Sequence, residues 1–440
     1  MQTKTRLAFA IGKLTQLVVR KIRKGRGEAA PGLVALKLDP EFIGRCHEGI
    51  GQRIIISGTN GKTTTTNLIA AIFKGQNHSF LTNPSGSNLE RGIAASLLSL
   101  KPTTHTVLWE ADEAALIPIA TQVQPTHIVL MNIFRDQLDR YGEIDTTLYK
   151  WLKLLKTLPK ATIFLNADDP NLVFLGSQLK RHDVFYFGVE ADKTETVKLK
   201  HSADAVYCPI CHRELRYKSI QFSHLGSYNC VCGFARPKPH FAATNLKLSL
   251  SKATFSVAKK RVTVPLMGTY NAYNALAAFA LSFFLKLDTP KILQSMKTFK
   301  PVTGRQEMIE VKDKQIKLLL VKNPTGFDQV IDTLHALKKK VTLCIAINDR
   351  IADGTDVSWL WDVDFEKLAQ ITKKVIATGD RAHDLAVRLK YAGFSKKQFL
   401  VSTNKEKAVQ AFLKSRGKQL FLLPTYTALW ELRKLLRKQV

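Results

Sequence analysis

A short loop rich in glycine and hydroxyl residues is the first feature whose residue types and spacing could support chemistry. A β-branched run precedes this loop, and a helical stretch from Lys62 to about Phe73 follows it. Glycines allow backbone N–H groups to turn toward phosphate oxygens, and a helix N-terminus adds partial positive charge. Lys62 is expected to reach the outer phosphates, and the hydroxyl of Thr63 to ligate Mg²⁺. The residues predicted to bind a nucleotide are Gly58, Thr59, Asn60, Gly61, Lys62, Thr63 and Thr64.

The spacing of this loop departs from the common phosphate-loop form. That form needs a glycine five residues before Gly61, where Ile56 stands. A glycine-rich turn without a ligand is the alternative interpretation. The strand before the loop, the helix after it and the Gly-Lys-Thr triplet together favour phosphate binding.

Three carboxylates follow the next β-type run, which spans Thr106–Trp109: Glu110, Asp112 and Glu113. Mg²⁺ prefers hard oxygen ligands and usually takes one or two carboxylates together with substrate phosphates. Glu110 is nearest to the strand, and we assign it to Mg²⁺ and to catalysis beside Lys62. For Asp112, capping the N-terminus of a following helix is an equally good interpretation.

Four of the six cysteines lie in two short clusters separated by an aromatic-containing stretch. Two such knuckles are typical of a closed structural zinc site of the zinc-ribbon type, here at about residues 203–237, and chance clustering is the alternative. We expect metal binding to supply folding energy to a unit without a core of its own. The predicted zinc ligands are Cys208, Cys211, Cys230 and Cys232, whereas His212, His224 and His240 are expected to be ordinary surface residues.

A polar loop at residues 348–356 follows an apolar run at residues 341–347, and Trp359 and Trp361 come directly after it. Aromatic residues beside polar ones are enriched at protein interfaces. The loop is therefore interpreted either as a solvated turn or as part of an interface.

The elements that must position these residues form two α/β blocks. In the first block, short apolar runs alternate with helical stretches, which is typical of a parallel sheet covered on both faces. The carboxyl ends of such strands share one edge of the sheet, where ligands bind. The expected strands of this block are residues 53–56, 106–109, 127–131, 161–165 and 184–187, and they deliver Gly58, Glu110, Asn132 and Asn166 to that edge.

The second block begins near Pro301 and has Rossmann-like character. Its expected strands are residues 317–321, 341–347, 374–377, 398–401 and 419–423, and its last helix is residues 425–438. The predicted fold class is thus α/β, with a central domain that has a phosphate loop, a parallel sheet and the inserted zinc ribbon, and with a smaller C-terminal domain. The predicted bounds are a basic lead-in at 1–50, a central domain at 51–300 and a C-terminal domain at 301–440.

The charge is the unusual part of the composition, since 66 Lys and Arg against 36 Asp and Glu give a net +30. Such a field favours an anionic partner: a nucleic acid, an acidic membrane face or a phosphorylated substrate. Residues 1–27 are basic, and Leu7, Ile11, Leu14 and Val18 recur at helical spacing. We favour a helix packed on the main domain, with contact to anionic lipid as the alternative. No apolar run reaches the ~18 residues of a membrane span, so a cytoplasmic protein is expected, with peripheral contact at the inner membrane face left open.

Taken together, these residues resemble the Mur ligase family over nearly the whole chain. The matching motifs are the phosphate loop, the Asn132–Asp139 stretch, the adenine-side motif Gly268–Asn274 and the turn Gly304–Glu307. This resemblance implies a Mur-ligase fold and adds Asn271, Asn274 and Arg305 to the ATP-binding residues. Gln137 stands where amino-acid-adding members have a metal-binding histidine, and a neutral amide is a weaker ligand.

Within this family, the sequence is most similar to ligase subunits that work with a GatD-like glutaminase. The resemblance implies ATP-dependent amidation of the α-carboxylate of D-glutamate in the lipid II stem peptide. An acyl phosphate would form, and ammonia from the glutaminase would give D-isoglutamine. Asp349 would complete the partner's Cys-His catalytic pair, as the acid of a triad does.

Two other functions are kept as alternatives. The first is a Mur-type ligase that adds an amino acid to a cell-wall precursor. The second is a zinc-ribbon nucleic-acid-binding NTPase, which the charge suggests. We disfavour this second function because the sequence contains no recognised nucleic-acid motif.

Overall fold

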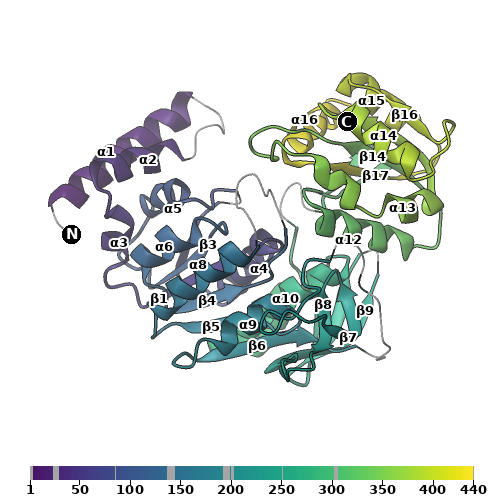
Figure 1. Ribbon diagram of the computed structural model, residues 1–440. Coiled ribbons are helices and arrows are strands. Elements are labelled where there is room, and N and C mark those ends of the chain that lie inside the picture. Colours follow the sequence, from purple (N-terminus) through teal and green to yellow (C-terminus); the bar gives the residue numbers. More distant parts are fainter. Residues whose placement is uncertain are drawn as a thin grey trace.

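The computed structural model describes residues 3–22, 29–84, 86–135, 144–191, 199, 203–249, 251–301 and 306–439. Within these residues, the chain forms a large sheet with helices on both faces, a smaller sheet with its own helices, and a short two-stranded hairpin. The N-terminal helices lie at one end of the molecule and the C-terminal sheet at the other (Figure 1). No helix of these residues is long and apolar enough to cross a membrane.

The large sheet has the strand order β11-β10-β9-β6-β5-β4-β1-β3-β2, and its strands from β2 to β9 pair in parallel. β1 is an interior strand between β3 and β4, so the loop that follows β1 opens at a crevice between connections to either side. Its strands are β1 (Gln52–Ser57), β2 (Phe80–Thr82), β3 (Thr106–Glu110), β4 (His127–Leu130), β5 (Thr162–Asn166), β6 (Val184–Val189), β9 (Phe241–Leu248), β10 (Ala253–Val257) and β11 (Lys260–Val264).

Successive residues of β1 point to opposite faces of the sheet, as strand geometry requires. Ile54 and Ile56 belong to the core beneath α4, α10 and α11, whereas Ile55 belongs to the core beneath the other helices. This double burial explains why the strand is a continuous β-branched run. One face is covered by α4 (Lys62–Gly75), α10 (Thr269–Phe284) and α11 (Thr289–Lys297). The other face is covered by α5 (Glu90–Leu97), α6 (Leu116–Val123), α8 (Ile144–Lys156) and α9 (Pro170–Ser177).

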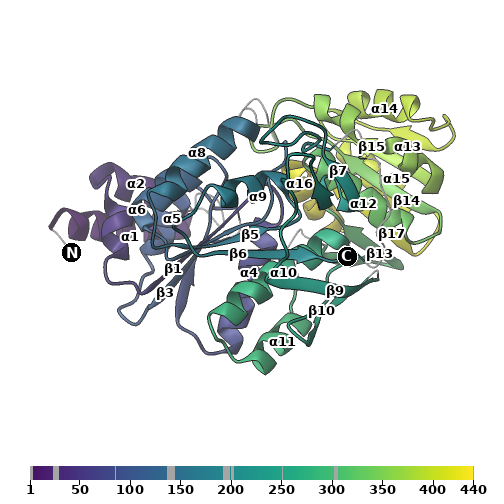
Figure 2. The same cartoon turned by 60° about the horizontal axis from the view of Figure 1, so that its bottom comes forward.

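The smaller sheet has the order β12-β13-β17-β14-β15-β16, and only β12 runs antiparallel to its neighbour. Figure 2 shows its helices on both sides of the strands. The strands are β12 (Met308–Val311), β13 (Lys314–Leu318), β14 (Val341–Ala346), β15 (Thr372–Thr378), β16 (Phe399–Val401) and β17 (Gln419–Pro424). The helices are α12 (Pro324–His335), the 3₁₀ helix η1 (Ser358–Asp362), α13 (Phe365–Ile371), α14 (Ala382–Tyr391), α15 (Lys405–Leu413) and α16 (Tyr426–Arg437).

Two further units attach to the large sheet. The antiparallel hairpin of β7 (Arg216–Phe222) and β8 (Leu225–Asn229) carries the clustered cysteines beside it. The N-terminal helices are α1 (Thr3–Ile22), α2 (Ala30–Leu38) and α3 (Phe42–His47), and α2 packs between α1 and α5.

The α/β class and both parallel sheets are confirmed, as are the expected strands around the phosphate loop. The expected strand at 317–321 begins three residues earlier than predicted, because β13 spans Lys314–Leu318 and starts at the hairpin turn from β12. Leu319 and Val321 still donate backbone hydrogen bonds to residues 422 and 424, so the apolar run continues beside β17 without regular pairing.

Candidate functional site

The phosphate loop is shaped by two glycines with positive φ, Gly58 at 130° and Gly61 at 91°. A Cβ on Gly61 would lie 2.0 Å from Oδ1 of Asn274, and one on Gly58 would lie 2.9 Å from the carbonyl oxygen of Asn132. Any other residue at either position would be strained and would collide with a neighbour. The loop is therefore shaped by close packing against two other motifs, and α4 starts directly after it.

The amide of Asn132, at the end of β4, fixes the middle of this loop. Its Oδ1 accepts a hydrogen bond from the backbone N–H of Asn60 at 2.8 Å, and its Nδ2 donates to the Asn60 carbonyl at 3.1 Å. This reciprocal pair explains how Asn132, which sequence analysis placed at the ligand edge, supports the loop.

Lys62 is buried and points back over its own loop. Its Nζ donates to the carbonyl oxygens of Gly58 at 2.5 Å and Thr59 at 3.2 Å, and to Oε2 of Glu113 at 2.7 Å. Burial raises the pKa of the Glu113 carboxyl, but the charges of Lys62 and Lys322 outweigh this effect and lower that pKa below its ordinary value. The lysine that would meet the outer phosphates thus has a carboxylate partner, which is the role of Glu113 that sequence analysis missed.

Thr63 and Glu110 form the second polar pair of the site. The Thr63 hydroxyl donates to Oε1 of Glu110 at 2.8 Å, and Asn83 bonds both the backbone N–H and the carbonyl of Glu110 at 2.9 Å. Cis ligands of an octahedral Mg²⁺ at 2.0–2.1 Å lie about 2.9 Å apart. The two predicted magnesium ligands therefore have the spacing that this ion needs.

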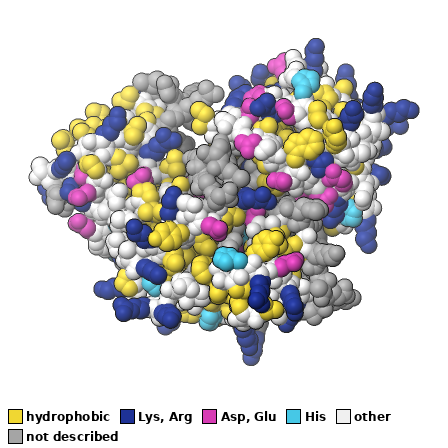
Figure 3. All heavy atoms as spheres, viewed as in Figure 1, with side chains coloured by type: hydrophobic (Ala, Val, Ile, Leu, Met, Phe, Trp, Pro, Cys, Tyr) yellow, Lys and Arg dark blue, Asp and Glu magenta, His cyan; other side chains and the backbone are white. Residues whose placement is uncertain are grey.

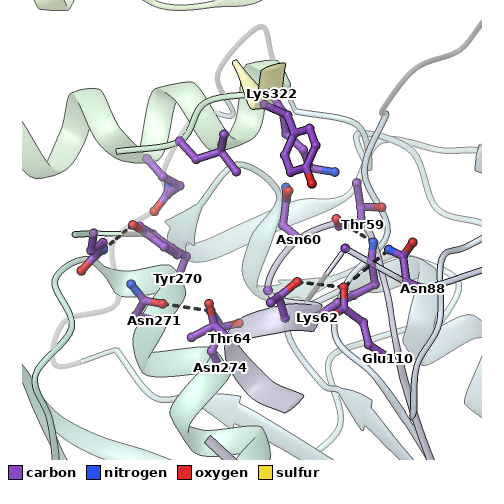
Figure 4. Close-up of a pocket in the computed structure, with 18 of the residues that line it drawn as sticks. Thr59, Asn60, Lys62, Thr64, Asn88, Glu110, Tyr270, Asn271, Asn274 and Lys322 are labelled. Atoms are coloured by element: carbon purple, nitrogen blue, oxygen red, sulfur yellow. Dashed lines mark hydrogen bonds between the residues drawn. The ribbon is translucent and has the colours of Figure 1, made fainter. Parts of the chain in front are cut away.

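A cleft of about 600 Å³ opens over these residues and lies between the two sheets. In Figure 4, Thr59, Lys62, Asn88 and Glu110 lie on one side of the cleft, Tyr270, Asn271 and Asn274 on another, and Lys322 approaches from the C-terminal domain. Asn274 donates to Oδ1 of Asn271 at 3.0 Å, and both amides are buried. The structure therefore brings together the predicted ATP-binding residues Gly61 to Thr64 with Asn271 and Asn274. Arg305 and Gln137 lie outside the described residues.

The C-terminal domain reaches the phosphate loop directly. Asn323 caps α12 by accepting from the N–H of Gly326, and its Nδ2 donates to Oδ1 of Asn60 at 3.3 Å. Asn323 and Lys322 had no motif to identify them, because their role depends on how the two domains meet.

Asp349 does not line this cleft. It follows β14 and forms an ion pair with Arg381 at 2.9 Å, with about a third of the Asp349 side chain exposed. Its neighbour Asn348 is buried and bonds Thr425 and Thr427, while Asp353 accepts from the backbone N–H of Thr427. The loop is thus fixed on both sides of a carboxylate that solvent and other molecules can reach.

The four clustered cysteines converge. Their Sγ atoms all lie within 4.8 Å of one another, with Cys208 and Cys232 3.6 Å apart and Cys211 and Cys230 3.4 Å apart. Tetrahedral Zn–S bonds of about 2.3 Å place sulfurs about 3.8 Å apart, so the donor set fits zinc. The unit is not without a core, however. Leu215, Tyr217, Tyr228, Phe234 and two of the cysteines pack together against Val173 of α9.

Two smaller expectations were wrong. His224 is fully buried rather than on the surface, because Phe134 packs against its ring at 4.8 Å and Asp169 lies 3.6 Å away. Asp112 does not cap α6, whose N-cap is Ala115; it lines the cleft instead.

The sheet order, the phosphate loop and the cleft between two α/β domains define an ATP-dependent ligase fold of the Mur type. The Mur ligase middle domain matches residues 56–231, and the MurT ligase C-terminal domain matches residues 320–429. The solved structures include a pseudomurein peptide ligase type C from Methanothermus fervidus, with a TM-score of 0.68 and 24% identity over 91% of this chain and 81% of that one. MurF from Acinetobacter baumannii has a TM-score of 0.68 and 16% identity over 92% and 80%. These likenesses show the fold.

Among curated proteins, the chain is 34% identical over 99% of its length to the lipid II isoglutaminyl synthase (glutamine-hydrolyzing) subunit MurT of Streptococcus pneumoniae, 98% of which is covered. It is 33% identical to the MurT subunit of Staphylococcus aureus strain COL, over 88% of this chain and 87% of the relative. The chain belongs to the MurT family of Mur ligases.

Proposed function

We propose that this chain is the ATP-dependent ligase subunit of a lipid II isoglutaminyl synthase. It would amidate the α-carboxylate of D-glutamate in the lipid II stem peptide with ammonia released from glutamine by a GatD-like partner. The observation that carries the proposal is an intact phosphate loop in a chain that is similar to MurT subunits over its full length. The same fold and loop also serve ligases that add amino acids, so the nitrogen donor is what the experiment must decide.

The cleft supports a two-step reaction. The loop amides and Lys62 would hold the β- and γ-phosphates of ATP while a substrate carboxylate oxygen attacks the γ-phosphorus and ADP leaves. Ammonia would then attack the acyl carbon, and phosphate would leave as the C–N bond forms. Positioning and charge neutralisation account for most of the first step. The hydrogen bond between Asn323 and Asn60 joins the two domains beside the phosphate loop, and closure of the domains there would exclude water from the acyl phosphate.

Thr63 and Glu110 would hold a magnesium ion, whose charge neutralises the phosphates when it is bound. The four cysteines would hold one structural zinc ion, with no position left for a substrate. Both assignments rest on the donor types and spacings described above.

Asp349 would act on the partner rather than on ATP. A carboxylate that orients a histidine of a Cys-His pair must be reachable from outside, and Asp349 is about a third exposed on a fixed loop. Exposed aromatic residues Trp361 and Tyr391, which contact each other in the same domain, suit a protein interface. Arg381 would exchange its contact with Asp349 for one with the partner.

The test is amidation of lipid II by the purified chain mixed with a GatD-like glutaminase, ATP, Mg²⁺ and glutamine, followed by mass spectrometry of the stem peptide. We expect conversion of one carboxylate to an amide, and we expect ammonium to replace glutamine and glutaminase together. ADP release driven by an amino acid, with no amide formed from ammonium, would instead support an amino-acid-adding ligase.

A further inference from the structure

Helix α1 attaches to the protein through its small residues. Ala8 is fully buried, and a Cβ on Gly12 would lie 2.8 Å from Leu98 and 3.5 Å from Ala35 of α2. Thr5 is also buried on this face and donates to Asp39 at 2.7 Å. Small residues allow two helices to approach closely, so this face is already packed.

Phe9 of α1 also packs inward, against Phe42, but four other large apolar residues of the helix point away from the protein. Leu7, Leu14, Leu17 and Val18 have 46–62% of their surface exposed, and no other described part of the chain covers them. Leu7, Leu14 and Val18 are seven and four residues apart, so they form one stripe along the helix. Figure 3 shows hydrophobic side chains gathered at the end of the molecule that α1 occupies in Figure 1. A helix that belongs only to a core directs its large apolar residues inward, whereas α1 exposes four of them on the face opposite to its packed one.

Basic residues flank this stripe. The exposed residues Arg6 and Lys13 lie on one side of it, Lys4 lies on the other, and Lys21 lies near its end. The whole helix contains no acidic residue. An apolar stripe between basic flanks on a helix too polar to span a bilayer is typical of a helix lying in a membrane interface. A protein partner would need an apolar groove with an acidic rim, whereas an anionic bilayer offers negative headgroups and an apolar interior over any area.

Helix α1 is connected to the catalytic cleft through packed helices. α2 carries α1 and packs on α5, where a Cβ on Gly32 would lie only 1.9 Å from the carbonyl oxygen of Arg91. Arg91 lines the cleft. A surface bound by α1 would therefore be linked to the wall of the cleft through α2 and then α5.

We propose that the outer face of α1, formed by the stripe and its basic flanks, docks on an anionic lipid bilayer. The apolar side chains would enter the headgroup region, and the basic side chains would meet lipid phosphates. The purpose of this contact rests on the proposed function, because a lipid-linked substrate must be met at a membrane. The contact itself does not depend on that function.

The direct experiment is flotation of the full-length chain with phosphatidylglycerol–phosphatidylcholine vesicles and with phosphatidylcholine vesicles. We expect binding to the anionic vesicles that weakens as salt rises. Leu7→Gln/Leu14→Gln should reduce that binding at least about tenfold, because two exposed leucines lose their burial in lipid. The matched control is Leu248→Gln/Leu400→Gln, which removes two leucines exposed elsewhere and should bind like the parent.

Charge is tested in the same way. Lys4→Glu/Arg6→Glu should weaken binding to anionic vesicles by at least roughly 25-fold, at about fivefold for each basic residue lost, because the new carboxylates also repel the anionic surface. Lys396→Glu/Lys397→Glu makes the same change in net charge in the C-terminal domain and should leave binding nearly unchanged. If the two double variants lost the same amount of vesicle binding, net charge alone would explain the binding and α1 would have no special role. Vesicle binding at the parental level by the leucine variant would overturn the proposal.

Two further readouts separate this inference from its rivals. With detergent-solubilised lipid II, the α1 variants should amidate at the parental rate, whereas with lipid II in anionic vesicles they should be slower. No amidation by the parent in either form would contradict the proposed function but not the vesicle binding. If the leucine variant instead changes the sedimentation of the chain alone, or its co-elution with a glutaminase, then a second copy or the partner covers this face and the bilayer proposal is wrong.

Discussion

The phosphate loop and the Asp349 loop each follow the end of a parallel strand in their own sheet, yet their charged residues differ in how far they are exposed. Both loops follow an interior parallel strand, β1 or β14, and both are held by an asparagine. Asn132, at the end of neighbouring β4, bonds the phosphate loop, whereas Asn348 of the second loop bonds Thr427 at the start of α16. In the first loop, Lys62 is buried and paired with Glu113, and both side chains are less than a tenth exposed. In the second loop, the pair of Asp349 and Arg381 is about a third exposed. A charge enclosed in a cleft suits a small ligand that replaces water, whereas a fixed but reachable charge suits a residue of another protein.

The largest expected effect comes from Lys62→Ala, which should lower both glutamine-driven and ammonium-driven amidation at least about 10³-fold. Removing one preorganised charge from a water-excluded site typically costs 10²–10³ in turnover, and here nucleotide binding suffers as well. Both activities should be measured as ADP release, with calorimetry to follow nucleotide binding. Lys396→Ala, an exposed lysine far from the cleft, is the control. A variant that kept its ammonium-driven activity would show that this loop does not hold the nucleotide.

Asp349→Asn should separate the two loops. Glutamine-driven amidation should fall roughly 10²-fold or more, because a general base that loses its orienting carboxylate loses most of its contribution. Ammonium-driven amidation and nucleotide binding should remain near the parental values, since Asp349 lies outside the cleft. The measurement is the ratio of the two rates at saturating ATP.

The control for that variant is Asp384→Asn, which also removes a partly exposed carboxylate paired with Arg381. It should retain both activities. If ammonium failed to rescue Asp349→Asn, this loop would be part of the ligase site and the comparison would be wrong.

Glu113→Gln tests what the buried pair does before nucleotide arrives. Without nucleotide, the free energy of unfolding should fall by about 2 kcal/mol, because a buried hydrogen bond between two charged groups becomes weaker. Nucleotide affinity should rise several-fold, since phosphates no longer compete with the carboxylate for Lys62. Denaturant unfolding with and without a non-hydrolysable nucleotide measures both effects, and weaker nucleotide binding would mean that Glu113 orients Lys62 toward its ligand.

The same pair predicts a pH dependence with a definite sign. The folded-state pKa of Glu113 lies below its ordinary value of 4.5. Its contribution to stability is therefore complete above pH 4.5 and is lost as the pH falls through the lowered folded value. The stability difference between the parent and Glu113→Gln should shrink over that acidic window and stay constant at neutral pH.

The sequence allowed prediction of the features that repeat locally. β1 and the phosphate loop were predictable because a strand buried on both faces must be apolar throughout, and because Gly58 and Gly61 adopt backbone conformations that favour glycine. Glu110 was predictable because it ends a strand at the ligand edge of the sheet.

Other features depend on distant contacts and left no local signal. Glu113 is 51 residues from Lys62, and Asn323 is 263 residues from Asn60, so only the fold brings these partners together. His224 was misjudged because its burial comes from Phe134, on another segment. The stripe on α1 has the periodicity of a packed helix, and periodicity alone does not say which face is turned inward.

The smallest expected effect on catalysis comes from Cys208→Ser, although its effect on stability should be clear. Loss of one thiolate should abolish binding of the proposed zinc ion and lower the thermal unfolding midpoint, because a structural metal would contribute to folding of the unit. The hairpin of the cysteine unit reaches the cleft, because Phe222 at the end of β7 lines it and packs against Tyr273, whereas the four cysteines do not line it. Arg236 pairs with Asp168, and Asp168 accepts a hydrogen bond from Tyr273 of α10, the helix that also carries Asn271 and Asn274. Below the new midpoint, both loops should work within about threefold of the parent, because the cysteines themselves lie outside the cleft and the core around Tyr217 and Tyr228 should keep the hairpin in place. Metal analysis, thermal unfolding and the two amidation assays on one preparation measure this. A selective loss of glutamine-driven activity would instead mean that the partner also contacts the cysteine unit. The surface that serves the partner would then include the cysteine unit as well as the Asp349 loop.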